Sequence, residues 1–136
     1  SCIPNCQLRP LSQIMIAPVV GPEVVSGSTR LKAGTATKMV LNMLTTGAMI
    51  RIGKTFGNRM VDVRATNEKL VARSRQMLAE IVGIPTDQAD QLLQQCDGEV
   101  KTAIVVHMKE VSPQTARQLL VDVDGHLSRL LATPSK

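Results

Sequence analysis

A chain of 136 residues has room for one ordinary domain, or for one small domain and part of another. Hydrophobic residues make up 43% of it but aromatic residues only 1%, so a core must be built from aliphatic side chains and methionine. The net charge is +5 and cations cluster in residues 51–75, yet Phe56 alone could stack on a base, which argues against a single-stranded nucleic-acid partner. We expect these charges to lie on solvated helix faces.

The chain has an odd number of cysteines, Cys2, Cys6 and Cys96, and so no paired framework. Cys2 and Cys6 lack the close cysteine or histidine partners that a zinc site requires. We therefore expect free thiols in a reducing cytoplasm and no bound metal. Uncharged runs such as residues 39–50 are shorter than the roughly 18 residues that indicate a membrane span, and the first residues do not resemble a signal peptide. The expected protein is cytoplasmic and has no membrane contact.

Residues 13–20 are apolar almost throughout, which is typical of a strand covered on both faces in a parallel α/β sheet. Pro18 would lie near its end or on an edge. No second run of this quality follows, and a lone buried strand would leave its backbone edges unpaired. We expect the rest of the sheet to lie upstream of Ser1. A small protein whose strand pairs across a dimer is the alternative.

Residues 21–38 begin where an apolar run stops and end inside a predicted helix, and they combine small hydroxyl residues, a glycine that frees the backbone and three cations. Free N–H groups and the helix dipole favour an anion at a helix N-terminus. Hydroxyls of Ser26, Ser28 and Thr29 could add donors. Charge could come from Arg30, Lys32 and Lys38. This composition fits a phosphate cradle, while a plain helix cap by Ser28 or Thr29 fits it equally well.

Residues 29–46 predict a helix that ends near Gly47. Its apolar positions recur at helical spacing and are expected to pack in a core; they are Leu31, Ala36, Met39, Val40, Met43 and Leu44. Gly53 and Gly57 interrupt residues 48–63, in which residues 60–63 fit a short strand or a helical turn.

Residues 66–132 predict a small all-helical bundle joined by short turns. Helices are expected over residues 66–82, 86–96, 97–111, 112–121 and 127–132, with Thr66 and Ser112 as N-caps and Pro113 at a first helical position. The three central helices resemble the ubiquitin-associated type of fold, which implies architecture rather than ubiquitin binding. His107 and His126 are expected to be structural or surface residues.

The segment GPEVVSGSTRLKAGTATK, residues 21–38, resembles the signature shared by N-acetylmuramic acid 6-phosphate etherases and glucokinase regulatory proteins. Residues 39–49, MVDV at 60–63 and ATN at 65–67 also resemble the bacterial etherases, and the likeness weakens after about Leu93. The resemblance implies that residues 1–64 are the C-terminal part of a doubly wound α/β sugar isomerase domain, contributing its last strand and helix. Residues 65–136 would be a C-terminal helical domain.

The resemblance implies a lyase that cleaves the D-lactyl ether of N-acetylmuramic acid 6-phosphate in cell-wall amino-sugar recycling. The products would be N-acetylglucosamine 6-phosphate and D-lactate, formed by elimination and water addition without a metal or organic cofactor. The family's catalytic glutamates lie upstream, so this chain alone is expected to be inactive. A cytoplasmic homodimer is implied. The alternative is a non-catalytic sugar-phosphate regulator, like the glucokinase regulatory proteins, that signals through a partner.

The substrate-binding residues implied by the motif are Glu23, Ser26, Gly27, Ser28, Thr29 and Lys32. In the related regulatory proteins the motif glutamate contacts the bound sugar phosphate. For Glu23 the alternative is a structural carboxylate held by the nearby helix N-terminus. Arg30 and Lys38 are candidates for pairing with a neighbouring subunit.

Overall fold

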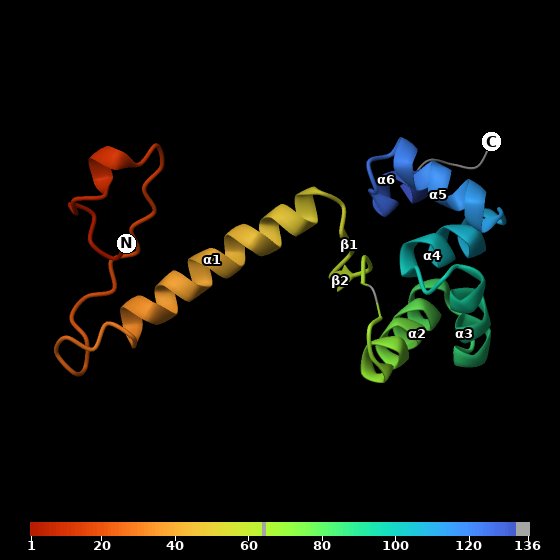
Figure 1. Cartoon of the computed structure of the whole chain (residues 1–136), viewed down its shortest axis with the longest axis horizontal. Helices are drawn as coiled ribbons and strands as arrows, with labels where there is room; N and C mark the ends of the chain where they lie inside the picture. The colour runs from red at the N-terminus through yellow and green to blue at the C-terminus, as the bar shows by residue number, and fades with distance from the viewer. Residues whose placement is uncertain (64, 133–136) are drawn as a thin grey trace. The chain divides into compact units, whose positions relative to one another are not determined.

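The computed structural model describes residues 1–63 and 65–132 (Figure 1). The chain divides into two compact units, Ser1–Ala48 and Met49–Lys136. Its described part is mostly helical, with one small antiparallel sheet. The elements in chain order are the 3-10 helix η1 (Arg9–Leu11), α1 (Lys32–Arg51), β1 (Thr55–Phe56), β2 (Arg59–Met60), α2 (Glu68–Val82), α3 (Thr86–Gln95), α4 (Val100–Lys109), α5 (Pro113–Asp122) and α6 (Leu127–Ala132).

The strand expected over residues 13–20 is not formed. The described sheet consists of β1 and β2 alone, so this apolar run has no neighbour with which to form a ladder. Its side chains are largely exposed, as at Ile14 (82%) and Val19 (71%). Throughout residues 1–48, no side chain is buried by the described chain. The parallel-sheet part of the predicted fold class is therefore absent from this structure.

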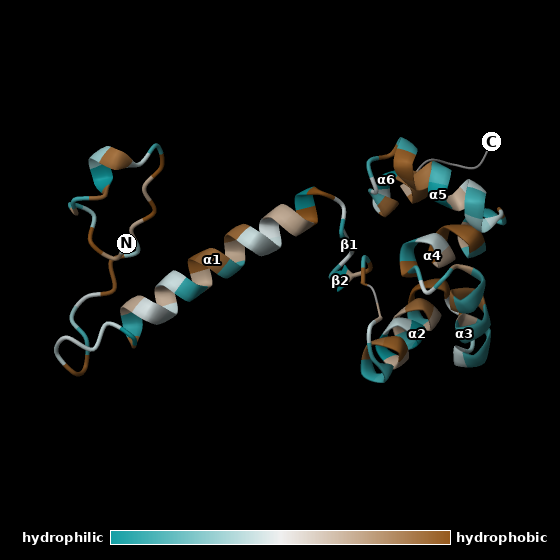
Figure 2. Cartoon of the chain, viewed as in Figure 1, coloured by the Kyte–Doolittle hydropathy of each residue, from teal (hydrophilic) through white to brown (hydrophobic). Residues whose placement is uncertain are grey.

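Helix α1 begins at Lys32, three residues later than predicted, and continues through Gly47 to Arg51. Gly53 ends it with φ +74, and the N–H groups of Gly53 and Lys54 donate to the carbonyls of Ile50 and Met49. Its expected core side chains are exposed, including Met39 (55%) and Met43 (62%). The core packing predicted for α1 is wrong within this chain, and Figure 2 shows the apolar residues distributed along it.

A hairpin opens the second unit and settles the ambiguity over residues 48–63. Thr55 lies opposite Met60 and Phe56 opposite Arg59, and Gly57 supplies a positive φ of +57 in the two-residue turn between the strands. The following Val61 is 1% exposed and lies in the core of the helices. Because Phe56 and Val61 pack against this core, the compact unit extends upstream of residue 65. The predicted domain boundary after residue 64 stays a prediction.

The bundle predicted over residues 66–132 is present, with α4 in contact with α2, α3, α5 and α6. Its largest fully buried side chains are Leu78, Ile104, Leu127, Val61, Val100, Val105 and Cys96. Burial of aliphatic side chains removes apolar surface from water. Each Å² buried stabilises the folded state by about 25 cal/mol, which is the main stabilising contribution in such a core.

The helix ends test the predicted caps. Ser112 caps α5, since its hydroxyl accepts the N–H of Thr115 at 3.1 Å and Pro113 follows it, as predicted. Asn67 rather than Thr66 caps α2, accepting the N–H of Leu70 at 2.9 Å. Glu99 takes the N-cap position of α4, one residue after the expected Asp97-Gly98. Helix α6 has the predicted bounds.

Within residues 1–63 and 65–132, no helix combines the length and the hydropathy that crossing a bilayer requires.

Candidate functional site

The predicted ligand segment forms a tight turn directly before α1. The N–H of Ser28 donates to the carbonyl of Val25 at 3.0 Å, and the N–H of Thr29 donates to the carbonyl of Gly27 at 3.0 Å. Gly27 has φ +82 and would have nothing within 4 Å of an added Cβ, so the glycine is needed for its backbone conformation rather than for space. Small hydroxyl residues are thereby grouped on one short, exposed turn, which we call the 26–29 turn.

Glu23 lies at the N-terminus of α1. Its Oε2 accepts the N–H of Lys32 at 2.9 Å and its Oε1 accepts the N–H of Ala33 at 3.0 Å. These two hydrogen bonds, that from Ala33 first, lower the pKa of Glu23 below its usual value, and the charge of Lys32 lowers it further. Neither Ser28 nor Thr29 caps the helix, because the carboxylate of Glu23 takes that role.

The side chain of Lys32 extends back toward the segment that carries Glu23. Its ammonium donates to the carbonyl of Val20 at 3.1 Å and to the carbonyl of Pro22 at 2.8 Å. Gly21, between these two carbonyls, has φ +69, and an added Cβ would come within 3.9 Å of the Lys32 ammonium. Two of the six predicted substrate-binding residues, Glu23 and Lys32, are thus bonded to backbone groups of this chain.

The first turn of α1 leaves no N–H group for an anion in this conformation. Besides the N–H groups bonded to Glu23, that of Gly34 donates to the carbonyl of Thr29 at 2.8 Å and that of Thr35 to the carbonyl of Leu31 at 3.0 Å. The cradle predicted on the helix N-terminus would therefore have to draw its donors from the preceding turn.

The 26–29 turn does keep such donors. The hydroxyls of Ser26, Ser28 and Thr29, and the N–H groups of Ser26 and Gly27, make no hydrogen bond to any described residue. Ser28 is half-buried and the other three residues are exposed. Arg30 and Lys38 are also exposed, and neither forms an ion pair within residues 1–63 and 65–132.

A pocket of about 620 Å³ lies beside the first turns of α1. Of the predicted site residues, Glu23 and Thr29 line it, whereas Ser26, Gly27, Ser28 and Lys32 do not. Cys2 closes one side, with its Sγ 3.6 Å from the carbonyl oxygen of Ala33. The structure therefore brings only part of the predicted set to this pocket.

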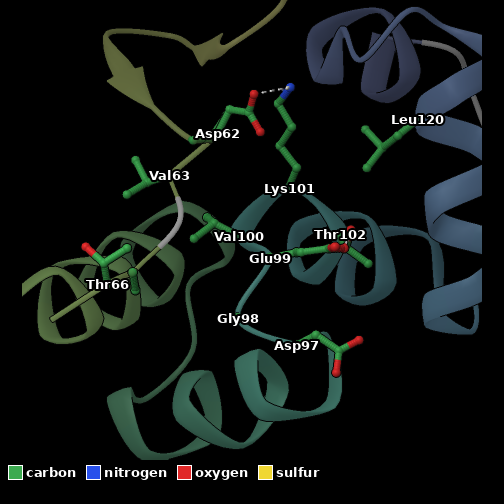
Figure 3. Close-up of a pocket in the computed structure, with 12 residues that line it drawn as sticks. Asp62, Val63, Thr66, Asp97, Gly98, Glu99, Val100, Lys101, Thr102 and Leu120 are labelled. Atoms are coloured by element: carbon green, nitrogen blue, oxygen red, sulfur yellow. Dashed lines mark hydrogen bonds and ion pairs between the residues drawn. The ribbon is translucent and has the colours of Figure 1, made fainter. Parts of the chain in front are cut away.

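The second unit holds a separate pocket of about 640 Å³, which the sequence did not indicate (Figure 3). Lys101 lies on its wall with a side chain only 13% exposed and an ammonium 4.0 Å from Asp62, which also pairs with Lys54. Burial lowers the pKa of Lys101, and the nearby charge of Asp62 opposes this shift. The charges on this wall are paired with one another, which indicates a structural role.

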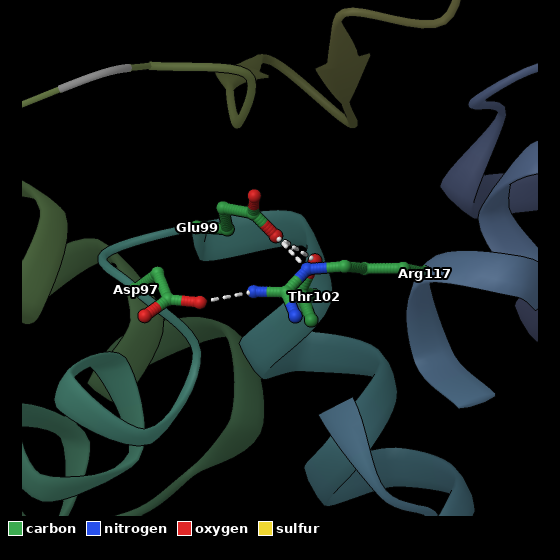
Figure 4. Close-up of polar contacts among 4 residues, drawn as sticks. All are labelled: Asp97, Glu99, Thr102 and Arg117. Carbon is green, nitrogen blue, oxygen red and sulfur yellow. Dashed lines mark hydrogen bonds and ion pairs between the residues drawn. The ribbon is translucent and has the colours of Figure 1, made fainter. Parts of the chain in front are cut away.

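Three residues that line this pocket, Asp97, Glu99 and Thr102, belong to a network around Arg117 of α5 (Figure 4). The guanidinium donates to Glu99 at 2.8 Å and to Asp97 at 2.6 Å, and the hydroxyl of Thr102 donates to Glu99 at 2.7 Å. The network joins α5 to the turn between α3 and α4. The Thr102 hydroxyl in this network is buried, with Thr102 only 2% exposed, so the network acts as a structural link between these elements.

The cysteines are free thiols, as predicted: Cys96 is buried, while Cys2 and Cys6 are half-buried. Across the described ranges, no three histidine, cysteine or acidic side chains gather in a way that could hold a metal ion.

No protein-family model matches the chain. Curated proteins similar to this chain carry the name N-acetylmuramic acid 6-phosphate etherase, among them proteins of three different bacteria. That of Rhodopirellula baltica is 91% identical over 136 residues, which are 100% of this chain and 45% of the relative. That of Aliivibrio fischeri strain MJ11 is 51% identical over 132 residues, 97% of this chain and 44% of the relative. That of Pasteurella multocida is 50% identical over 131 residues, with 96% and 44% covered. The chain spans less than half the length of these relatives.

Proposed function

We propose that this chain is part of an N-acetylmuramic acid 6-phosphate etherase, a carbon–oxygen lyase of amino-sugar recycling. The observation that carries the proposal is the 91% identity over the whole chain to a protein of that name. The longer enzyme would cleave the D-lactyl ether of its substrate to give N-acetylglucosamine 6-phosphate and D-lactate in the cytoplasm. A sugar-phosphate regulator is not favoured, because the Aliivibrio and Pasteurella relatives bear the etherase name as well.

The role proposed for this segment is to supply the phosphate-binding loop. Exposed hydroxyls of Ser26 and Thr29, the half-buried hydroxyl of Ser28 and the N–H groups of Ser26 and Gly27 are donors without partners among the described residues. Donors of this kind suit the three acceptor oxygens of a phosphate monoester. Glu23 and Lys32 complete the proposed site from the two ends of the loop. Neither a metal nor an organic cofactor is part of the proposal.

The proposed architecture places α1 and the apolar residues 13–20 in a sugar isomerase domain. Exposed side chains such as Ile14, Met43 and Leu44 support this idea, since an apolar stripe needs a partner to bury it. The length of the relatives supports it too, because they are more than twice as long as the aligned chain. A homodimer and a ubiquitin-associated-like helical domain belong to the same proposal.

Release of D-lactate from N-acetylmuramic acid 6-phosphate tests the function. We expect the full-length protein that contains this chain to release D-lactate and the 136-residue chain alone to release none, because the proposed catalytic glutamates lie outside it. Lactate release by the chain alone would contradict the proposed division of roles. No release by the folded full-length protein would contradict the function itself.

Substitution of Ser28→Ala in the full-length protein tests the site. Loss of one hydroxyl donor to a phosphate should raise KM about tenfold, the size of effect expected for a hydrogen bond to a charged group. Ser128→Ala is the matched control, because Ser128 is an exposed serine of α6. An unchanged KM for Ser28→Ala would remove this residue from the site.

A further inference from the structure

Glu23 and Lys32 hold each other's backbone segments. The Glu23 carboxylate binds the N–H groups of Lys32 and Ala33, while the Lys32 ammonium binds the carbonyls of Val20 and Pro22. The four distances are 2.9, 3.0, 3.1 and 2.8 Å. We call this set of bonds the Glu23–Lys32 clasp.

The clasp closes a loop whose ends are nine residues apart in sequence. Each side chain is tied to backbone at the other end of the loop, so neither end can move without breaking charge-assisted hydrogen bonds. The residues between the ends include the 26–29 turn, whose donors have no partner among the described residues. The clasp therefore holds the backbone on both sides of the 26–29 turn in place, while the donors of the turn stay available to a ligand.

We propose that Glu23 and Lys32 are positioning residues that hold the 26–29 turn in its phosphate-binding conformation. The inference rests on the proposed function and deepens it, because it assigns separate roles within one predicted site. The turn recognises the phosphate of a phosphorylated sugar, and the clasp acts on the ligand only through the turn. A pre-formed loop binds more tightly because it does not have to be ordered when the ligand arrives.

This division of roles has a consequence that a direct sugar contact does not share. A carboxylate that accepts hydrogen bonds from sugar hydroxyls affects only ligands that contain the sugar. A carboxylate that shapes the phosphate turn affects every phosphate ligand by the same factor. Inorganic phosphate and N-acetylglucosamine 6-phosphate are therefore the two probes that separate the alternatives.

The test measures the Kd of both probes for the full-length protein, its Glu23→Gln and Lys32→Gln variants and the double variant. We expect Glu23→Gln to raise the Kd of both probes by the same factor, about tenfold, which corresponds to about 1.4 kcal/mol of binding free energy. The double variant should bind no more weakly than the weaker single variant, since opening either end releases the loop. In lactate release, KM should rise while kcat changes little.

Glu80→Gln is the matched control, because Glu80 is an exposed carboxylate whose pKa is likewise lowered, first by its hydrogen bond from Arg59 and then by that from Gln76. It should leave both Kd values unchanged. Thermal unfolding checks each variant, and if Glu23→Gln does not fold, Lys32→Gln carries the test with the carboxylate cap intact.

If Glu23→Gln weakened the binding of N-acetylglucosamine 6-phosphate but not that of inorganic phosphate, the inference would be overturned and Glu23 would be a direct sugar ligand. Additive losses in the double variant would also overturn it. If the folded wild-type protein binds neither probe, the proposed function fails and the inference fails with it.

Discussion

Gly53 occupies a position where a side chain has no room. It is buried, has φ +74, and an added Cβ would lie 3.0 Å from the carbonyl oxygen of Gly125 and 3.0 Å from Cγ of His126. We expect Gly53→Ala to destabilise the helical unit by about 2–4 kcal/mol, combining left-handed backbone strain with overpacking. Urea unfolding of residues 49–136 measures this loss.

Gly57→Ala is the control for Gly53→Ala. Its φ of +57 is similarly positive, but nothing lies within 4 Å of the added Cβ. Only the backbone cost of about 1 kcal/mol should remain. Equal losses for the two variants would contradict a steric role for the contact with Gly125 and His126.

Ser74 is a buried hydroxyl without a partner. Its side chain is 2% exposed, and its Oγ has no hydrogen bond to any part of the chain that the structure describes. An unsatisfied buried polar group costs roughly 1–3 kcal/mol, so Ser74→Ala should be neutral or should stabilise the helical unit by up to about 1 kcal/mol. Urea unfolding tests this, with exposed Ser128→Ala as control. A loss above about 1 kcal/mol would mean that the hydroxyl is bonded.

Sequence patterns around single residues predicted some helix caps and missed others. The cap by Ser112 and Pro113 follows from adjacent residues, and it is confirmed. The cap of α1 could not be found in this way, because Glu23 is nine residues from Lys32 in sequence and reaches it only once the turn has formed. The motif did single out Glu23 and Lys32, but residue types alone cannot tell a ligand from a loop clasp.

The elements differ in how completely their own sequence determines them. Helices α2 to α6 were predicted with small errors at their ends, because glycines, caps and a proline mark those ends and apolar residues recur at helical spacing. The strand expected over residues 13–20 was wrong, since a strand needs a neighbouring strand and the described residues provide none for it. Helix α1 passed the predicted stop at Gly47, because a glycine inside a helix weakens it without ending it.

Autonomous folding should separate the two units. Residues 49–136 contain the buried core, whereas residues 1–48 bury no side chain. We expect a fragment of residues 49–136 to unfold cooperatively and to show a helical circular dichroism spectrum. A fragment of residues 1–48 should be mostly unstructured, since isolated helices without packing are marginal in water. A stable helical spectrum for residues 1–48 would contradict this account of α1.

The network around Arg117 predicts acid sensitivity of the contact between α5 and the turn before α4. Burial raises the pKa of Glu99, but hydrogen bonds from Thr102 and Arg117 outweigh it and hold the pKa below 4.5. A carboxyl with a depressed pKa stabilises the folded state above its unfolded pKa, and this contribution is lost as the pH falls through the lower folded value. The loss therefore occurs below about pH 4.5.

Arg117→Met tests this prediction. Because the Arg117 side chain is 36% exposed, solvent screens its ion pairs, and their removal should cause only a small loss of stability at neutral pH. Urea unfolding as a function of pH should show that loss, with a shallower decline below pH 4.5 than in wild type. Arg73→Met, at an exposed arginine of α2, is the control. An unchanged acid slope in Arg117→Met would contradict the proposed origin of the shift.

The whole molecule joins a unit with its own core to a segment that exposes apolar side chains. Among residues 1–63 and 65–132, the fifteen buried hydrophobic residues all lie from Val61 to Leu130, while exposed ones such as Leu11 (82%) and Val24 (87%) lie before α1. This distribution suits a segment that completes a larger domain, and the relatives leave room for one because 45% of the Rhodopirellula protein is aligned. We propose that the 26–29 turn forms a complete phosphosugar-binding site only within that larger domain.

The most direct test of the central claim is an NMR titration of the isotope-labelled full-length protein with N-acetylglucosamine 6-phosphate. Saturable shifts of the Ser26 and Gly27 amides are expected, because their N–H groups are open donors of the turn. The amides of Lys32 and Ala33 should move little, because Glu23 already holds them. Saturable binding that leaves the amides of Ser26–Thr29 unchanged would contradict the claim that this turn grips the phosphate.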